Sequence, residues 1–162
     1  MKTQFRRRRE KKTDYKLRMK LLKSGKKRIV IRKTNRYIII QAVESNEARD
    51  KILAGVSSRE LVKEGWDKTG SLKSIPAAYL TGLLAAKRIK EKKIREEFIL
   101  DIGMIINKKG GRMYAAAKGL IDGGIKINVS KDVFPSEERI RGEHLKADIK
   151  INKIMEKISN KL

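Results

Sequence analysis

The sequence has no cysteine, one histidine and two prolines among its 162 residues. The lack of cysteine excludes disulfide bonds, thiolate metal sites and cysteine nucleophiles. A nucleophilic triad would need His144 as its base, but this residue lies in a highly charged segment, where a surface contact is the commoner role. Aromatic residues make up 5% and hydrophobic residues 40% of the chain, so we expect one domain with an aliphatic core.

Long apolar runs are also missing. The longest stretch without a charge spans 13 residues, 74–86, whereas a helix that crosses a bilayer needs roughly 18 or more. The basic N-terminus is not followed by the apolar stretch of roughly 7–15 residues that a secretory signal requires. We therefore expect a cytoplasmic protein without a transmembrane segment.

Positive charge is what the sequence has in excess. The chain has 42 basic and 19 acidic residues, a net charge of +23, and such a charge attracts extended polyanions. Residues 1–36 contain 17 of the basic residues and 2 of the acidic ones. Four arginines, Arg6 to Arg9, are consecutive, and guanidinium groups bind phosphates through paired hydrogen bonds. The composition therefore predicts nucleic acid as the partner.

Residues 1–26 are predicted to form a basic, partly helical arm. Thr13 and Asp14 are favoured N-cap residues, apolar residues follow at helical spacing from Tyr15, and Gly25 can end the helix. One alternative is a solvated, disordered tail, although such tails normally mix charges of both signs. Another is a helix lying on an anionic membrane, but the apolar face of this helix is too small for stable insertion.

Residues 27–135 are predicted to form a mixed α/β core. Two runs rich in β-branched residues, "RIVIRK" and "RYIIIQAVES", flank a turn at Thr34-Asn35 and predict a hairpin. The segments "KILAGVS" and "EFILDIGMII" predict two further strands. Ser57 and Glu60 have the spacing of a capping box and predict a short helix that ends at Gly65.

Two long helices and a C-terminal segment complete the prediction. Ser74 can cap the helix in "SIPAAYLTGLLAAKRIKEKK", and glycines bracket a second helix in "GGRMYAAAKGLIDGG". Residues 136–162 are expected to form a polar stretch followed by an amphipathic helix that contains Ile149, Ile154 and Ile158.

A last short strand is suggested by the alternation of Ile125, Ile127 and Val129 with polar residues. The predicted fold class is therefore α/β, with a mixed sheet covered by helices and a basic arm before it.

One enzymatic alternative depends on Asp101, an acid at the end of the apolar run "FILD". Metal-dependent nucleases present a first metal ligand in this way, but two-metal chemistry requires several carboxylates that converge on the cations. No second apolar strand in the sequence carries an isolated acid. The simpler interpretation is that Asp101 caps a sheet edge or pairs with a lysine.

Five blocks of the sequence, in order, resemble a known family. They are "FRRRREKKTDY", "TNRYIIIQ", "PAAYLTGLLAAKR", "AAAKGLIDGG" and "FPSEERIRGEHL". The chain resembles the large-subunit ribosomal protein L-eighteen family, in its archaeal and eukaryotic branch, whose eukaryotic member is called L-five. The resemblance runs through nearly the whole chain.

The resemblance implies a structural protein of the central protuberance that binds 5S ribosomal RNA, without catalytic activity, cofactor, metal or small-molecule substrate. It also implies contacts with the large ribosomal RNA and with neighbouring proteins, including the other 5S-binding protein. Asp14 would cap the arm helix. The residues expected to bind RNA lie in the arm, at the hairpin and in one loop: Arg6, Arg7, Arg8, Arg9, Lys11, Lys12, Thr13, Tyr15, Arg18, Lys26, Lys27, Arg32, Thr34, Asn35, Arg36 and Lys68.

Overall fold

The computed structural model describes residues 3–47, 49–67, 70–143, 145 and 151–159. Its centre is a four-stranded mixed sheet with the strand order β3-β2-β1-β4. The strands are β1 (Lys27–Lys33), β2 (Ile38–Asn46), β3 (Arg49–Ser57) and β4 (Phe98–Asp101). β1 pairs antiparallel with β2 and parallel with β4, and β2 pairs antiparallel with β3. The predicted hairpin, third strand and α/β fold class are confirmed.

The β1–β2 hairpin forms because the side chains of both strands favour a sheet and the residues between them favour a tight turn. Ile29 and Ile31 of β1 and Ile40 of β2 are buried on one face of the sheet, and β-branched residues favour such a pleated, half-buried surface. At the turn, the backbone N–H of Tyr37 donates to Thr34 Oγ1 at 2.8 Å. The hydroxyl of Thr34 thus closes the turn that sequence reasoning placed at this position.

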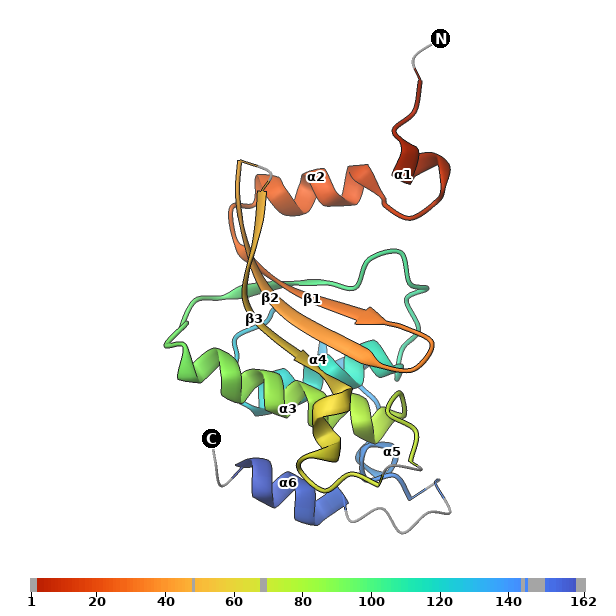
Figure 1. The fold of residues 1–162 in the computed structure, drawn as a ribbon, viewed down its shortest axis with the longest axis vertical. Helices are drawn as coiled ribbons and strands as arrows, with labels where there is room; N and C mark the ends of the chain where they lie inside the picture. The colour runs from red at the N-terminus through yellow and green to blue at the C-terminus, as the bar shows by residue number, and fades with distance from the viewer. Residues whose placement is uncertain (1–2, 48, 68–69, 144, 146–150, 160–162) are drawn as a thin grey trace.

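Helices cover one face of the sheet (Figure 1). The α-helices are α1 (Arg6–Arg9), α2 (Tyr15–Lys23), α3 (Ile75–Glu91), α4 (Arg112–Asp122), α5 (Glu137–Arg141) and α6 (Ile151–Ser159). Two short 3-10 segments are η1 (Ser58–Val62) and η2 (Lys131–Val133). α3 begins at Ser74, whose side chain accepts from the backbone N–H of Ala77, and most of its residues are buried because it lies between the sheet, α4 and α6.

Two glycines let α3 and α4 approach until their backbones touch. A Cβ atom added to Gly82 of α3 would lie 2.2 Å from the carbonyl oxygen of Ala116, and one added to Gly119 of α4 would lie 2.2 Å from that of Tyr79. Neither position has room for even a methyl group. The helix pair is therefore fixed at a separation that only glycine permits.

The C-terminal helices belong to the same apolar core. Ile140 of α5 and Ile151, Ile154 and Ile158 of α6 are buried, and both helices contact α3. α5 lies in the stretch that was expected to be polar, for which no helix was predicted, and α6 is the predicted amphipathic helix. Ile149 lies outside the described residues, and the division of the chain at residue 136 stays a prediction.

The strand predicted at Ile125, Ile127 and Val129 is wrong. In this segment only Ile127 forms a β-bridge, with Phe98, and the backbone N–H of Phe98 donates to the carbonyl of Lys126 at 2.9 Å. β4 itself ends at Asp101, earlier than predicted, because Gly103 turns the chain with φ of +68°. β4 therefore offers only four residues for pairing with this segment, and a single bridge is what forms.

Candidate nucleic-acid interface

The arm lies at one end of the molecule and consists of α1 and α2 (Figure 1). Asp14 caps α2: its carboxylate accepts from the backbone N–H groups of Lys16 at 2.9 Å and Leu17 at 3.1 Å. Gly25 follows the helix with φ of +64°, a conformation that glycine adopts without strain. Neither α1 nor α2 has a buried residue, so their cations can be reached by a partner, although Arg6 also pairs with Glu10 and Arg18 with Asp50.

The four consecutive arginines form one helical turn, which sequence reasoning did not predict. A hydrogen bond links this turn to the segment just before α2: Arg7 Nε donates to the hydroxyl of Thr13 at 2.9 Å. The rings of Phe5 and Tyr15 also meet, with their centroids 5.4 Å apart. Tyr15, expected to bind RNA, thus has an aromatic neighbour within the arm.

Arg28 connects the arm to the sheet and is only 2% exposed. Its Nη2 donates to Asp50 Oδ1 at 2.8 Å, and its Nη1 donates to Asp101 Oδ2 at 3.2 Å. From the arm, Arg18 Nη2 donates to the second oxygen of Asp50 at 3.1 Å. Burial acts to raise the pKa of Asp50, but hydrogen bonds from Ser45 and Arg18 and the charge of Arg28 hold it below its ordinary value,. The ionised Asp50 therefore links α2 to β1.

Asp101 is occupied by arginines. Besides Arg28, Arg32 donates to its Oδ1 at 2.9 Å, as does the backbone N–H of Gly103. Across the described ranges, no group of three or more His, Cys, Asp or Glu side chains could hold a metal ion. Asp101 therefore pairs with cations, as the simpler interpretation held, although the partners are arginines and not a lysine.

A groove of about 370 Å³ separates the arm from the sheet. Arg7, Lys12 and Arg18 line it from the arm, and Arg32 and Lys33 line it from β1. The side chain of Arg32 is 42% exposed although it also bonds Asp101. The structure thus brings cations that are far apart in the sequence to one concave surface, which we call the arm groove.

Lys26 and Lys27, which were also predicted to bind RNA, do not line the arm groove. Lys26 pairs with Glu97, and Lys27 pairs with Glu96 at 2.6 Å and Glu44 at 3.3 Å. The hydrogen bond that Lys27 donates to Glu96, helped by Glu44, raises the pKa of Lys27 against the opposing effect of burial. These two lysines are therefore neutralised by acids of the chain itself.

The hairpin turn lies at the other end of β1. Thr34 uses its hydroxyl inside the turn, the carbonyl of Asn35 accepts from Lys73 Nζ at 2.9 Å, and Arg36 is exposed. β1 spans seven residues, so Lys26 and the hairpin turn lie roughly 20 Å apart. The two therefore cannot bind the same phosphate. Lys68 lies outside the described residues.

Sequence reasoning missed Arg28 and Asp50 as parts of this interface. The only local signal was Arg28 itself, a charge that shares one strand face with Val30 in an otherwise apolar run.

No helix in the described part of the chain is long and apolar enough to cross a membrane.

Comparison with known proteins gives consistent matches. A family model described as "Ribosomal large subunit proteins 60S L5, and 50S L18" matches residues 1–98. The chain is 52% identical over 144 residues to the large ribosomal subunit protein uL18 of Korarchaeum cryptofilum. The aligned region covers 89% of this chain and 72% of that protein. It is 47% identical over 143 residues to uL18 of Methanoregula boonei, with 88% and 80% covered, and 44% identical over 142 residues to uL18 of Aeropyrum pernix, with 87% and 65% covered.

Proposed function

The chain belongs to the family of the large-subunit ribosomal proteins 60S L5 and 50S L18, and on this basis we propose that it binds 5S ribosomal RNA. In this proposal the protein helps to attach 5S RNA to the large ribosomal RNA in the central protuberance. Its neighbours are other large-subunit proteins, including the second 5S-binding protein, and its location is the cytoplasmic ribosome.

The observation that carries the proposal is the gathering of cations in and beside the arm groove. Arg7 and Lys12 of the arm and Lys33 of β1 line this groove, and the remaining arginines of the leading quartet stand exposed next to it. An RNA backbone supplies phosphates at regular intervals, and neutralising several of them releases counterions. A concave, cationic surface of this kind favours binding by the shape of the RNA more than by its sequence.

The nuclease alternative gains no support from the geometry. The carboxylate of Asp101 already accepts three hydrogen bonds, from Arg28, Arg32 and the backbone of Gly103. A metal ion at this place would have to displace two guanidinium groups. The proposed function therefore contains no catalytic step through Asp101.

The decisive experiment replaces Arg6–Arg9 with alanine and measures the affinity for a 5S ribosomal RNA transcript across a salt series. We expect weaker binding and a flatter plot of log affinity against log salt, by roughly 0.7–0.9 for each phosphate contact that is lost. A matched control removes four exposed cations that have no ion pair in the described structure and lie outside the arm: Lys90, Lys92, Arg95 and Lys109.

The two variants lose the same net charge, so their comparison separates a local contact from a general attraction. A salt slope equal to that of the parent in the arginine variant would reject the quartet as a phosphate contact. Equal losses in both variants would reject the arm as the binding site and leave only nonspecific attraction.

A further inference from the structure

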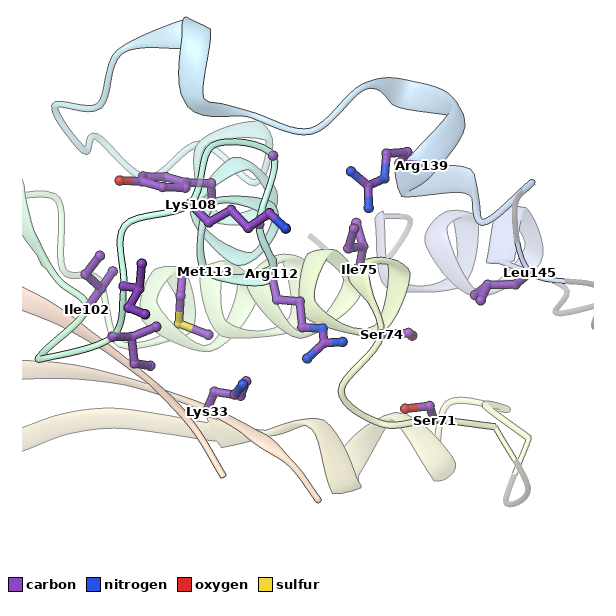
Figure 2. A pocket seen from close by; sticks show the side chains of 15 residues that line it. Lys33, Ser71, Ser74, Ile75, Ile102, Lys108, Arg112, Met113, Arg139 and Leu145 are labelled. Carbon is purple, nitrogen blue, oxygen red and sulfur yellow. The ribbon is translucent and has the colours of Figure 1, made fainter. Parts of the chain in front are cut away.

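A second concave surface, of about 670 Å³, is lined in part by the loop that follows β4 (Figure 2). We call it the loop groove. It lies between the 102–111 loop, the first turns of α3 and α4, and α5. Residues Lys33, Ile102 and Ile105 line both grooves, so the loop forms the wall between them. Of the residues that line this second surface, the proposed function uses only Lys33.

The loop groove has an aliphatic lining. Ile75 and Met113 form its buried part, Ile102 and Ile105 are partly buried, and Ile106 stands at its rim with 89% of its surface exposed. Covering an isoleucine that is left in water gains about 1.5–3 kcal/mol. An isoleucine so exposed beside a concave apolar surface therefore favours contact with another apolar surface.

The rim of the loop groove is cationic, and none of the described residues that line it is an acid. Lys33, Lys108, Arg112 and Arg139 line it and are exposed, and Figure 2 shows Arg112 and Arg139 reaching toward the open space from α4 and α5. In the described ranges, none of the four forms an ion pair. The nearby carboxylate of Glu137 pairs with Lys118 and Arg141 instead.

The backbone adds to this positive field. α3 and α4 both begin at the groove, and neither has an acidic residue in its first turn. Arg112 occupies the first turn of α4, where a cation meets the positive end of the helix dipole. A negative group supplied from outside would relieve this repulsion.

We propose that the loop groove binds an acidic, amphipathic segment of a neighbouring protein. Apolar side chains of that segment enter between Ile75, Ile105 and Ile106, and its Asp or Glu residues pair with the cations at the rim. This contact is distinct from 5S RNA binding through the arm, because none of the arm residues that line the arm groove lines the loop groove.

The lining favours protein over RNA as the occupant. Bases that bind to proteins stack on aromatic rings or guanidinium planes, whereas the centre of this groove is isoleucine and methionine, and its guanidinium groups, Arg112 and Arg139, lie at the rim. Among the described residues of its lining, the one aromatic is Tyr114, which is 7% exposed and whose hydroxyl donates to Asn107. An aliphatic centre with a charged rim is the usual composition of a protein–protein interface.

The test places a photoreactive benzoylphenylalanine at Ile106 in the full chain, after assembly into the large ribosomal subunit in cells. Irradiation is expected to join the chain to another protein, at a segment with Asp or Glu within a few residues of the adduct. The matched control carries the same probe at Ile52 of β3, an isoleucine that is 56% exposed and does not line the groove. We expect no adduct to the same segment from this position.

Charge reversal then tests the cationic rim. The pair Lys108→Glu and Arg112→Glu, added to the Ile106 probe, is expected to lower the adduct yield per assembled chain by about tenfold. The pair Lys90→Glu and Lys92→Glu makes the same charge change away from the groove and is expected to leave the yield unchanged. An adduct to RNA, an adduct within the chain itself, no adduct, or a yield indifferent to the first pair would each overturn the proposal.

Discussion

Arg28 combines a permanent charge with almost complete burial. Its guanidinium group is shared between Asp50 of β3 and Asp101 of β4, so it joins strands on both sides of β1 and, through Arg18, the arm as well. A buried charge is tolerated only when its partners are in place. Arg28 is therefore a structural residue at the base of the arm, although its type and its surroundings suggest an RNA contact.

Replacing Arg28 with methionine should lower the free energy of unfolding by about 3–5 kcal/mol, because Asp101 and Asp50 lose their buried counter-charge. Arg32→Met is the matched change: it removes a second arginine from the same Asp101, but one whose side chain is 42% exposed, and it should cost about 0–1 kcal/mol. Denaturant titration of both variants gives the two values. Equal costs would show that burial does not set the strength of these pairs.

Sequence reasoning succeeded at single residues where the partner is close along the chain. The caps formed by Asp14 and Ser74 and the capping box of Ser57 with Glu60 are all present, because each depends on spacings of two or three residues. Arg28 and Asp50 are 22 residues apart, and their contact requires the register of three strands. No local pattern contains that register.

The crossing of α3 and α4 brings the backbones of two helices into contact. Gly82 and Gly119 face the backbone of the opposite helix at a distance that excludes a Cβ atom. The sequence motifs "YLTGLL" and "AAAKGL" show small residues at these positions, but only the structure shows that they meet. The glycines therefore define how the helical layer is built.

Gly82→Ala should destabilise the protein by about 1–3 kcal/mol or more, because its Cβ would overlap the carbonyl of Ala116 and force the helices apart. The control is Gly55→Ala in β3, where the nearest atom to the new Cβ lies 3.7 Å away, which is ordinary contact. Thermal unfolding monitored by circular dichroism measures both. A Gly82→Ala protein as stable as the parent would mean that the helices can separate without loss.

The sequence predicted an element correctly where the apolar residues repeated regularly over a long segment. The hairpin, α3 and α4 follow from runs of apolar residues that repeat at the period of a strand or a helix. The strand expected at Ile125 and Val129 failed because three alternating residues cannot form a strand without a partner of sufficient length, and β4 has four residues. α5 was missed because a helix of five residues has almost no periodicity to detect.

At the scale of the whole molecule, charge and core are separated. The arm holds exposed cations and no buried residue, whereas the sheet and the helices α3, α4, α5 and α6 share one apolar core. The net charge and its concentration in the first 36 residues were visible in the sequence. The two grooves were not, since each combines residues from distant segments around the loop after β4.

Deleting residues 1–25 should leave a folded protein that no longer binds 5S RNA tightly. The deletion removes one partly exposed ion pair to the core, between Arg18 and Asp50, so the free energy of unfolding should change by less than about 1 kcal/mol. Calorimetry and an RNA-binding titration on the same preparation measure both quantities. Unchanged affinity would reject the arm as the RNA-binding element, and an unfolded product would contradict the separation of arm and core.

The glycine contact between α3 and α4 has a consequence beyond stability. The two helices begin at the loop groove, so the backbone contact at Gly82 and Gly119 fixes the spacing of Ser74 and Arg112 on its wall. A ligand that meets such a wall finds its binding geometry already set and does not have to order these positions on arrival. Recognition at this surface is therefore preorganised by a crossing point deep inside the fold.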